Sequence, residues 1–458
     1  MSSPVIPKPD IVLQKLGIWN YKQLSLSLFG AFIWGLTIFP MLIPSFVQID
    51  IVCDDCNPRL NKSKKMKDTY NLSNNELQWY SITFYIGCMI GGVTIAYLSD
   101  IYGRKLISLG SFLIVGVTGM LTAWMPKYSY ILILRVIQGI FYPAAGVCMW
   151  ILVLESVSFD NHTTVGLMFN VLWSVGYCIV ALIAYYFPSW DVLSILLSAP
   201  LIIVFFIAYF IMPESFYFLL KSENSSGLKK FINNKVNVNI DEMINEVKIM
   251  ETQYEIMKVF KYFIVHKKYI IYSFVTSFLW TTQFLLYLTF SISSSTLSGN
   301  PYWNFVFSGL AELPSVLSGP FIMNKFHRKK PLIVCSIAIL ISCICLIFIP
   351  ENYTTTYLIF WMACKLLLAF TYVCIYVYFP EIFSTEIRNT AIGLCQTIAN
   401  FGGILNTLLR TWIPKNSNLM ILFAVLSTTS TILFFLLPET KEENITDENI
   451  SEDEILNN

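Results

Sequence analysis

The sequence predicts an all-α membrane protein with twelve transmembrane helices arranged as two similar bundles of six. The 458-residue chain is 55% hydrophobic and only 13% charged, with a mean hydropathy of +0.62. A soluble protein of this length carries about a quarter charged residues. Twelve apolar stretches are long enough to cross a bilayer, which takes about 20 residues. Polar and charged residues at the ends of these stretches recur in the second half of the chain.

The twelve predicted spans are apolar stretches that are separated by short polar segments, except for one long polar segment after the sixth. They lie near 24–47, 79–98, 106–125, 130–154, 165–187, 192–212, 269–292, 302–323, 331–349, 356–379, 391–413 and 418–437. The edges of the sixth, ninth and twelfth spans are blurred by Pro213, Pro350 and Pro438. An even number of spans puts both termini on the same side of the membrane.

Anchoring residues recur at a nearly constant separation along the chain. The pairs are Asp100 and Asn324, 224 residues apart; Glu155 and Glu381, 226 apart; and the segments 213–215 and 438–440, 225 apart. Each anchor follows an apolar stretch. Internal duplication of this kind is typical of secondary transporters, in which the substrate site lies between two halves that move against each other.

The charges in short loops predict the orientation, because cytoplasmic loops carry an excess of Lys and Arg. Arg104, Lys105, Lys325 and 328–330 lie on one side, with few cations on the other. Both termini are therefore predicted to be cytoplasmic. The protein is expected in the plasma membrane. The predicted organisation is a first bundle over 1–213 with an extracellular loop at 48–78, a cytoplasmic linker with amphipathic helices over 214–268, a second bundle over 269–440, and a disordered acidic tail over 441–458.

The predicted extracellular loops carry candidate modification sites. Asn61, Asn71 and Asn352 stand in Asn-X-Ser/Thr sequences and are glycosylation acceptors in this orientation. Of eleven cysteines, only Cys53 and Cys56 lie in a polar loop, where they form either a local disulfide or free thiols. Two cysteines alone do not make a zinc site, which needs four ligands.

Two ionisable residues fall deep inside predicted spans, where an unpaired charge costs several kcal/mol. Glu312 lies in the middle of the eighth span, and Lys365 lies about nine residues into the tenth. Helical spacing puts Lys365, Tyr372 and Tyr376 on one face. This face is predicted to line a central cavity. The alternatives are a structural Lys365–Glu312 pair, or a Lys365 side chain that extends to the membrane surface.

Five segments resemble one known family. They are Gly87, Gly91 and 98–105 (LSDIYGRK); Arg135, Gly139 and Glu155; 213–215 (PES); Gly299, Asn300, Tyr302 and 312–314 (ELP); and Tyr378, Glu381, Thr385, Arg388, Asn389 and Gly393. In order and spacing they resemble the organic cation, anion and carnitine transporters of the major facilitator superfamily. The chain departs from that family in its short first extracellular loop and at 216–218, His162, Asn324 and His327.

The resemblance implies a network of charges at the cytoplasmic helix ends that controls opening toward the cytosol. Each contact there is worth about 1 kcal/mol where water reaches it, which keeps the two states close in energy. The predicted gating residues are Asp100, Gly103, Arg104, Glu155, Glu214, Arg328, Glu381 and Arg388. The alternative is that the cations among them only enforce the topology.

The resemblance also implies substrate-binding positions. Tyr287 stands where the family has a cavity tyrosine, and Lys365 where it has a basic residue. Asn400 stands where the cation transporters tend to carry an aspartate and the anion and carnitine transporters an arginine. The predicted substrate-binding residues are Lys365, Asn400, Tyr287, Tyr372, Tyr376 and Glu312. A neutral Asn400 favours neutral, zwitterionic or weakly anionic substrates, with Lys365 as the main attractor.

The sequence thus predicts a transporter of small organic solutes that works by alternating access, through facilitated diffusion or exchange. It contains no nucleotide-binding glycine-rich loop and no catalytic cluster, so we expect no enzyme activity, cofactor or metal. The net charge of +1 gives no reason to expect nucleic acid as a partner. The expected partners are the substrate and the bilayer, and one chain suffices. The alternatives are a non-transporting receptor or vesicle-trafficking glycoprotein with the same fold, a sugar porter, or a membrane-embedded enzyme.

Overall fold

The computed structural model describes residues 8–17, 20–49, 63–232, 240, 243–244, 267–350, 352–384, 387–413 and 416–440. In these ranges the protein is helical, without β-strands. Eleven helical segments of the described chain are long and apolar enough to cross a membrane. The second predicted span corresponds to α7 (Trp79–Tyr102), whose 24 residues extend about 36 Å, which is also sufficient.

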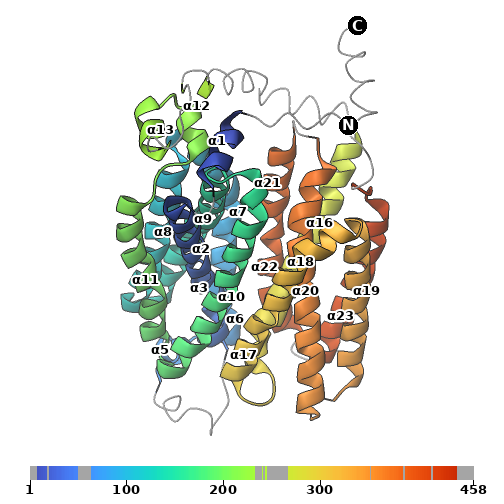
Figure 1. Cartoon of the computed structure of the whole chain (residues 1–458). Helices are drawn as coiled ribbons and strands as arrows, with labels where there is room; N and C mark the ends of the chain where they lie inside the picture. Colours follow the sequence, from blue (N-terminus) through green and yellow to red (C-terminus); the bar gives the residue numbers. More distant parts are fainter. Residues whose placement is uncertain are drawn as a thin grey trace.

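The helices form two groups that lie side by side (Figure 1). The first group contains α2 (Tyr21–Leu36), α3 (Ile38–Leu42), α4 (Pro44–Val47), α7, α8 (Arg104–Leu121), α9 (Tyr128–Leu154), α10 (His162–Tyr186) and α11 (Trp190–Ile211). The second contains α16 (Lys267–Ile292), α17 (Pro301–Leu310), α18 (Glu312–Lys325), α19 (Lys329–Phe348), α20 (Thr354–Ile382), α21 (Arg388–Ala399), α22 (Phe401–Trp412) and α23 (Asn416–Leu436). Within the first group α9 packs against α7 and α8, and within the second α19 packs against α20 and α23.

Three spans that were predicted as continuous are divided in the structure. The first consists of α2, α3 and α4, the eighth of α17 and α18, and the eleventh of α21 and α22. Proline explains two of the divisions, because it cannot donate the hydrogen bond to the carbonyl four residues earlier. Pro44 leaves the carbonyl of Pro40 free in the first span, and Pro314 does the same for Leu310 in the eighth. In the eleventh span, Gly402 and Gly403 weaken the helix after Asn400.

A layer of short helices covers one end of the first group, which we call the linker end. It consists of α1 (Lys8–Leu16), α12 (Phe216–Lys221) and α13 (Ser225–Ile232), whose apolar residues share one cluster with Met243 and Ile244. Figure 1 shows this layer at the top of the molecule. Asp10 Oδ1 accepts a hydrogen bond of 3.1 Å from the backbone N–H of Phe159 and fastens α1 to the α9–α10 loop. Much of the linker predicted over 214–268, from 233 to 266 except for 240 and 243–244, lies outside the described residues.

The two groups of helices are joined at the opposite end, which we call the loop end. This end carries α4, α5 (Met66–Thr69), η4 (Ser293–Thr296) and the start of α17. The hydroxyl of Ser295 donates to the carbonyl of Ser45 at 3.1 Å. The rings of Phe46 and Tyr302 stack with centroids 5.8 Å apart, and Tyr177 packs on Phe305 at 4.4 Å. Residues of both groups therefore share one apolar cluster at this end.

Candidate functional site

The interior of the second group holds a buried ion pair. Lys365 Nζ of α20 lies 2.7 Å from Glu312 Oε1 at the start of α18, and the two residues are 0% and 4% exposed. The division of the eighth span brings Glu312 to a helix N-terminus, where a negative charge is favoured. Two charges persist in a bundle interior only when each compensates the other. Of the placements left open by the sequence, the structure shows the pair, and Lys365 does not reach the membrane surface.

Hydrogen bonds around the pair satisfy both charges. Lys365 Nζ also donates to Ser291 Oγ at 2.5 Å, and the hydroxyl of Tyr287 donates to Glu312 Oε1 at 2.7 Å. The same ammonium group lies 3.5 Å from the centroid of the Tyr287 ring, a cation–π contact. Trp173 of α10 donates its indole N–H to the Tyr287 hydroxyl at 3.1 Å. This last bond links the first group of helices to the charged centre.

A strip of aromatic rings leads from the pair toward the linker end. The centroids of Tyr287 and Tyr372 are 5.4 Å apart, as are those of Tyr372 and Tyr376. Tyr376 is 42% exposed and accepts a hydrogen bond of 3.1 Å from Gln396 Nε2. The strip connects the buried pair to an accessible surface.

Asn400 lies at the break between α21 and α22. Its side-chain amide donates to the carbonyls of Gln396 and Thr397 in its own helix, at 3.2 and 3.3 Å. It lies one helical turn from Gln396, which bonds Tyr376 at the outer end of the aromatic strip, and neither of its described hydrogen bonds joins it to Lys365. A role in substrate binding remains a prediction.

Residues that sequence reasoning did not single out complete the site. The hydroxyl of Tyr177 on α10 donates to the Ser291 carbonyl at 3.0 Å and lies within hydrogen-bond distance, 3.1 Å, of Ser308 Oγ. Trp34, Trp150 and Phe169 form an aromatic cluster that includes Trp173. Ser291 follows Tyr287 by four residues, so the two lie on one face of the helix. This spacing was the sequence signal that could have placed Ser291 in the site.

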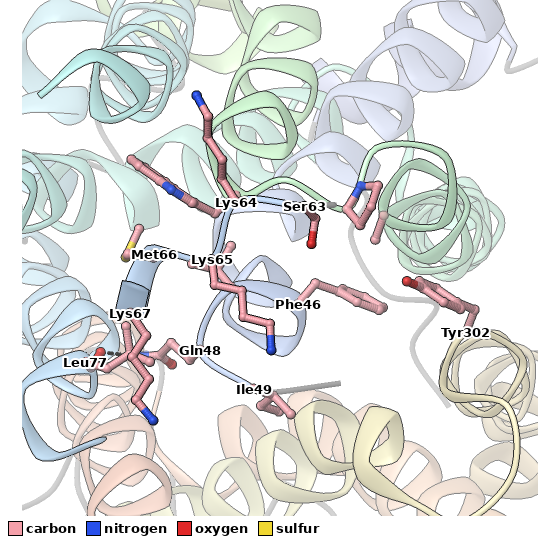
Figure 2. Close-up of a pocket in the computed structure, with 14 residues that line it drawn as sticks. Phe46, Gln48, Ile49, Ser63, Lys64, Lys65, Met66, Lys67, Leu77 and Tyr302 are labelled. Atoms are coloured by element: carbon pink, nitrogen blue, oxygen red, sulfur yellow. Dashed lines mark hydrogen bonds between the residues drawn. The ribbon is translucent and has the colours of Figure 1, made fainter. Parts of the chain in front are cut away.

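A pocket at the loop end shares no lining residue with the ion pair. Its lining includes Phe46, Gln48, Tyr302 and three lysines of the segment 64–67. Figure 2 shows Phe46 and Tyr302 at one side of it and Gln48 beside Leu77 at the other, where Gln48 Nε2 donates to the Leu77 carbonyl at 2.8 Å. Lys64 pairs with Asp191 at 3.4 Å.

The predicted charges of the first half meet at the linker end. Arg104 contacts Asp100 and lies 3.3 Å from Glu155, whose other oxygen accepts a hydrogen bond from Ser215. Glu214 accepts a bond of 2.8 Å from the backbone N–H of Lys105. Burial raises the pKa of Glu214 above its ordinary value, an effect that its backbone donors oppose.

Gly103 permits this arrangement at the turn between α7 and α8. Its φ of +103° belongs to the region that favours glycine. A Cβ at this position would lie 2.5 Å from Glu214 Oε2, so the Glu214 carboxylate would have to move to admit a side chain. Glycine is therefore favoured here by the backbone conformation, and it leaves room for the Glu214 carboxylate.

The second half repeats the geometry. Arg328 pairs with Glu381 at 3.2 Å, and Glu439 accepts from the backbone N–H groups of Arg328 and Lys329 at 2.9 and 3.2 Å. Glu439 thus stands where Glu214 stands in the first half. Each set of contacts lies within one half. Arg388 donates to the Phe383 carbonyl at 3.4 Å, so its described contact joins it to the end of α20 and not to Glu381.

The remaining candidates are loop residues. Cys53, Cys56 and Asn61 lie outside the described residues. Asn71, with a φ of +50°, and Asn352 are exposed at the loop end. Across the ranges that the structure describes, no group of His, Cys, Asp and Glu is arranged to hold a metal ion.

Membrane-spanning helices around a buried, hydrogen-bonded charge pair define the class of protein as a membrane transporter, and comparison with known proteins gives the same class. Residues 41–450 match the family described as sugar (and other) transporter, and the chain belongs to this family. It is 30% identical over 451 residues to putative transporter B0252.3 of Caenorhabditis elegans, covering 96% of this chain and 90% of that protein.

More distant relatives agree. The chain is 27% identical to solute carrier family 22 member 3 of Rattus norvegicus, over 78% of this chain and 65% of that carrier. It therefore spans about two thirds of the length of that carrier. The fold resembles the inward-open xylose transporter XylE from E. coli, with a TM-score of 0.68, 16% identity, and coverage of 94% of this chain and 98% of that one. The predicted resemblance to the major facilitator superfamily and the predicted fold class are confirmed.

Proposed function

We propose that the protein carries small organic solutes across the plasma membrane by alternating access, as a uniporter or exchanger, with residues 1–213 and 269–440 as the two moving units. The observation that carries the proposal is the Lys365–Glu312 pair, which is bonded to Trp173 of the first half through Tyr287. Charges at this depth are costly and mark substrate pathways in membrane proteins. Uptake of radiolabelled solutes into proteoliposomes tests the proposal. Proteoliposomes that contain a receptor or trafficking glycoprotein of the same fold would show no solute uptake.

The substrate class follows from the charges of the site. Lys365 and Glu312 compensate each other, so the centre attracts neither a strong cation nor a strong anion. Neutral and zwitterionic solutes, with an apolar or aromatic part that packs on Tyr372 and Tyr376, fit it best. An uptake panel of neutral, zwitterionic, cationic and anionic solutes, with sugars included, ranks this assignment against a sugar porter.

The proposed orientation puts the linker end in the cytosol. We expect N352Q to remove a glycan from the protein expressed in animal cells, because Asn352 is exposed at the loop end. N161Q is the matched control, since Asn161 stands in an Asn-His-Thr sequence at the linker end. Electrophoretic mobility before and after endoglycosidase treatment measures the effect. A glycan lost in N161Q and retained in N352Q would reverse the orientation.

The charges at the linker end are proposed to bias the balance between the two states. We expect D100N to favour opening at this end by at most about fivefold, because an exposed ion pair contributes about 1 kcal/mol and the Asp100–Arg104 pair, which lies within one half, acts on the balance only if it breaks as this end opens. The reporter is G393C, labelled from the linker side with an impermeant maleimide. A Cβ at Gly393 meets no atom within 4 Å, so the cysteine fits.

D191N is the matched control for this measurement. It removes a carboxylate from an ion pair at the loop end, where Asp191 contacts Lys64. Equal G393C labelling rates in D100N and the parent protein would show that Asp100 does not affect the state balance.

A further inference from the structure

Three lysines gather at the linker end of the first half, where α8 begins. Lys105 is the second residue of α8, and its Nζ lies 5.3 Å from the centroid of the Tyr209 ring near the end of α11. Lys229 and Lys230 belong to the last turn of α13 and are exposed. The charge of Lys230 acts on the Lys105 ammonium group, so cations of two different elements lie near each other. Neighbouring like charges repel each other unless an anion compensates them.

The packing of the linker layer fixes this arrangement. Helix α12 lies against the turn between α7 and α8, where a Cβ on Gly103 would lie 3.2 Å from the ring of Phe218. Helix α13 lies against α12, where a Cβ on Gly227 would lie 2.8 Å from the side chain of Leu219. Leu228 of α13 is buried in the same layer. The apolar face of α13 is therefore held on α12, and its lysines are left on the exposed face.

The described chain supplies little negative charge to these lysines. Glu214 is the carboxylate that acts on the charge of Lys105. Its Oε1 already accepts hydrogen bonds from the backbone N–H groups of Lys105 and Ser215, at 2.8 and 2.9 Å. Lys229 and Lys230 make no hydrogen bond or ion pair with any residue that the structure describes. A bound anion is the group that would compensate them.

Exposed apolar side chains lie next to these lysines along α8 and α11. Leu106 follows Lys105 in α8 and is 56% exposed. Phe210 and Ile211 end α11, with exposed fractions of 82% and 63%. Both helices are membrane-spanning segments, and Figure 1 shows α11 and α13 at the same outer edge of the molecule. Cations at the end of a span, beside exposed apolar side chains, match the phosphate and the acyl chains of a phospholipid.

We propose that Lys105, Lys229 and Lys230 bind the phosphate of an anionic phospholipid from the leaflet at the linker end. The ammonium groups donate hydrogen bonds to the phosphate oxygens, and the acyl chains lie along the exposed residues of α8 and α11. A lysine near a membrane surface changes the affinity for anionic lipid about fivefold. The bound lipid ties α13, and with it the linker, to the first half. Its binding does not depend on the proposed transport and needs only that α8 and α11 span a membrane.

Stabilisation of the purified full-length protein by dioleoyl phosphatidylglycerol in a neutral detergent tests the proposal. We expect this lipid to raise the Tm of the wild type more than dioleoyl phosphatidylcholine does at the same concentration. K229Q/K230Q should raise the apparent dissociation constant for phosphatidylglycerol about 25-fold, which is about fivefold for each lysine. K325Q/K330Q is the matched control, because it removes two exposed lysines from the linker end of the second half. Its dissociation constant should equal that of the wild type.

K229R/K230R separates the charges of α13 from its packing. It keeps both cations, so it should bind phosphatidylglycerol like the wild type, and a loss equal to that of K229Q/K230Q would contradict a phosphate site. Equal stabilisation of the wild type by the two lipids, an unchanged constant in K229Q/K230Q, or an equal loss in the control would overturn the assignment.

Glycerol phosphate, added at the same concentration as the lipid, distinguishes a free phosphate from a lipid headgroup. It should leave the Tm of the wild type unchanged, because it has no acyl chains to lie along α8 and α11. Stabilisation equal to that by phosphatidylglycerol would refute a lipid site. These measurements do not require solute uptake, so a protein that fails the transport assay still tests the lipid site.

Discussion

Replacing Lys365 by glutamine should reduce solute uptake at least tenfold and lower the Tm of the purified protein. The substitution leaves the Glu312 carboxylate buried, with the Tyr287 hydroxyl as its described donor. Removing one partner of a buried ion pair costs about 3–5 kcal/mol, because the other charge remains uncompensated. Tracer uptake and a thermal unfolding curve, recorded on the same preparation, measure both effects.

The double variant K365Q/E312Q separates a structural role from a transport role. It removes both charges, so most of the lost stability should return. Uptake should stay low, because the charges that hold the substrate are gone. A double variant that transports like the wild type would reduce the pair to a structural element. A K365Q variant as stable as the wild type would show that the pair is not compensated in the way the geometry indicates.

Replacing Arg135 by methionine should lower stability by about 3 kcal/mol or more, since each hydrogen bond to a charged group is worth about 1.5–3 kcal/mol. Arg135 is 1% exposed and donates to the carbonyls of Tyr80 and Pro40 at 3.1 and 3.3 Å and to Gln138 Oε1 at 2.5 Å. Its guanidinium also lies 4.2 Å from the Tyr80 ring centroid and 4.4 Å from that of Phe84.

The physical reason for this dependence lies in the first span. Pro44 has no N–H, so the carbonyl of Pro40 has no donor in its own helix and accepts from Arg135 of α9 instead. The side chain therefore ties α3, α7 and α9 together. R135K should recover only part of the stability, because an ammonium group lacks the planar fork. K127M, at an exposed position, is the control. Equal Tm values for R135M and K127M would contradict the assignment.

The sequence predicted the positions of the spans and a group of charged residues at the linker end. Apolar length fixes where helices cross a membrane, and this signal is local. The recurrence of Asp100, Glu155 and Glu381 at the ends of spans predicted charge clusters, and the structure brings Asp100 and Glu155 together on Arg104. The divisions of three spans were not predicted, although Pro44 and Pro314 gave a local signal for two of them.

The sequence did not predict which charges pair. Arg328, Glu381 and Arg388 were all predicted as gating residues without assigned partners; in the structure Glu381 meets Arg328 and Thr440, which come from other segments. Asn400 was predicted to bind substrate from its position in the chain; in the structure its amide bonds to its own helix, and the predicted role is not tested by that contact.

Composition and the lengths of the apolar stretches determined that this chain is a membrane protein. The recurrence of polar residues at the ends of the stretches indicated two similar halves. Both signals can be read along the chain without knowledge of which segments pack together. The tertiary structure decided whether Lys365 would face lipid, water or Glu312, because that choice depends on where α18 begins and how it packs on α20. Burial and pairing are relations between distant segments, and they exist only once the helices have come together.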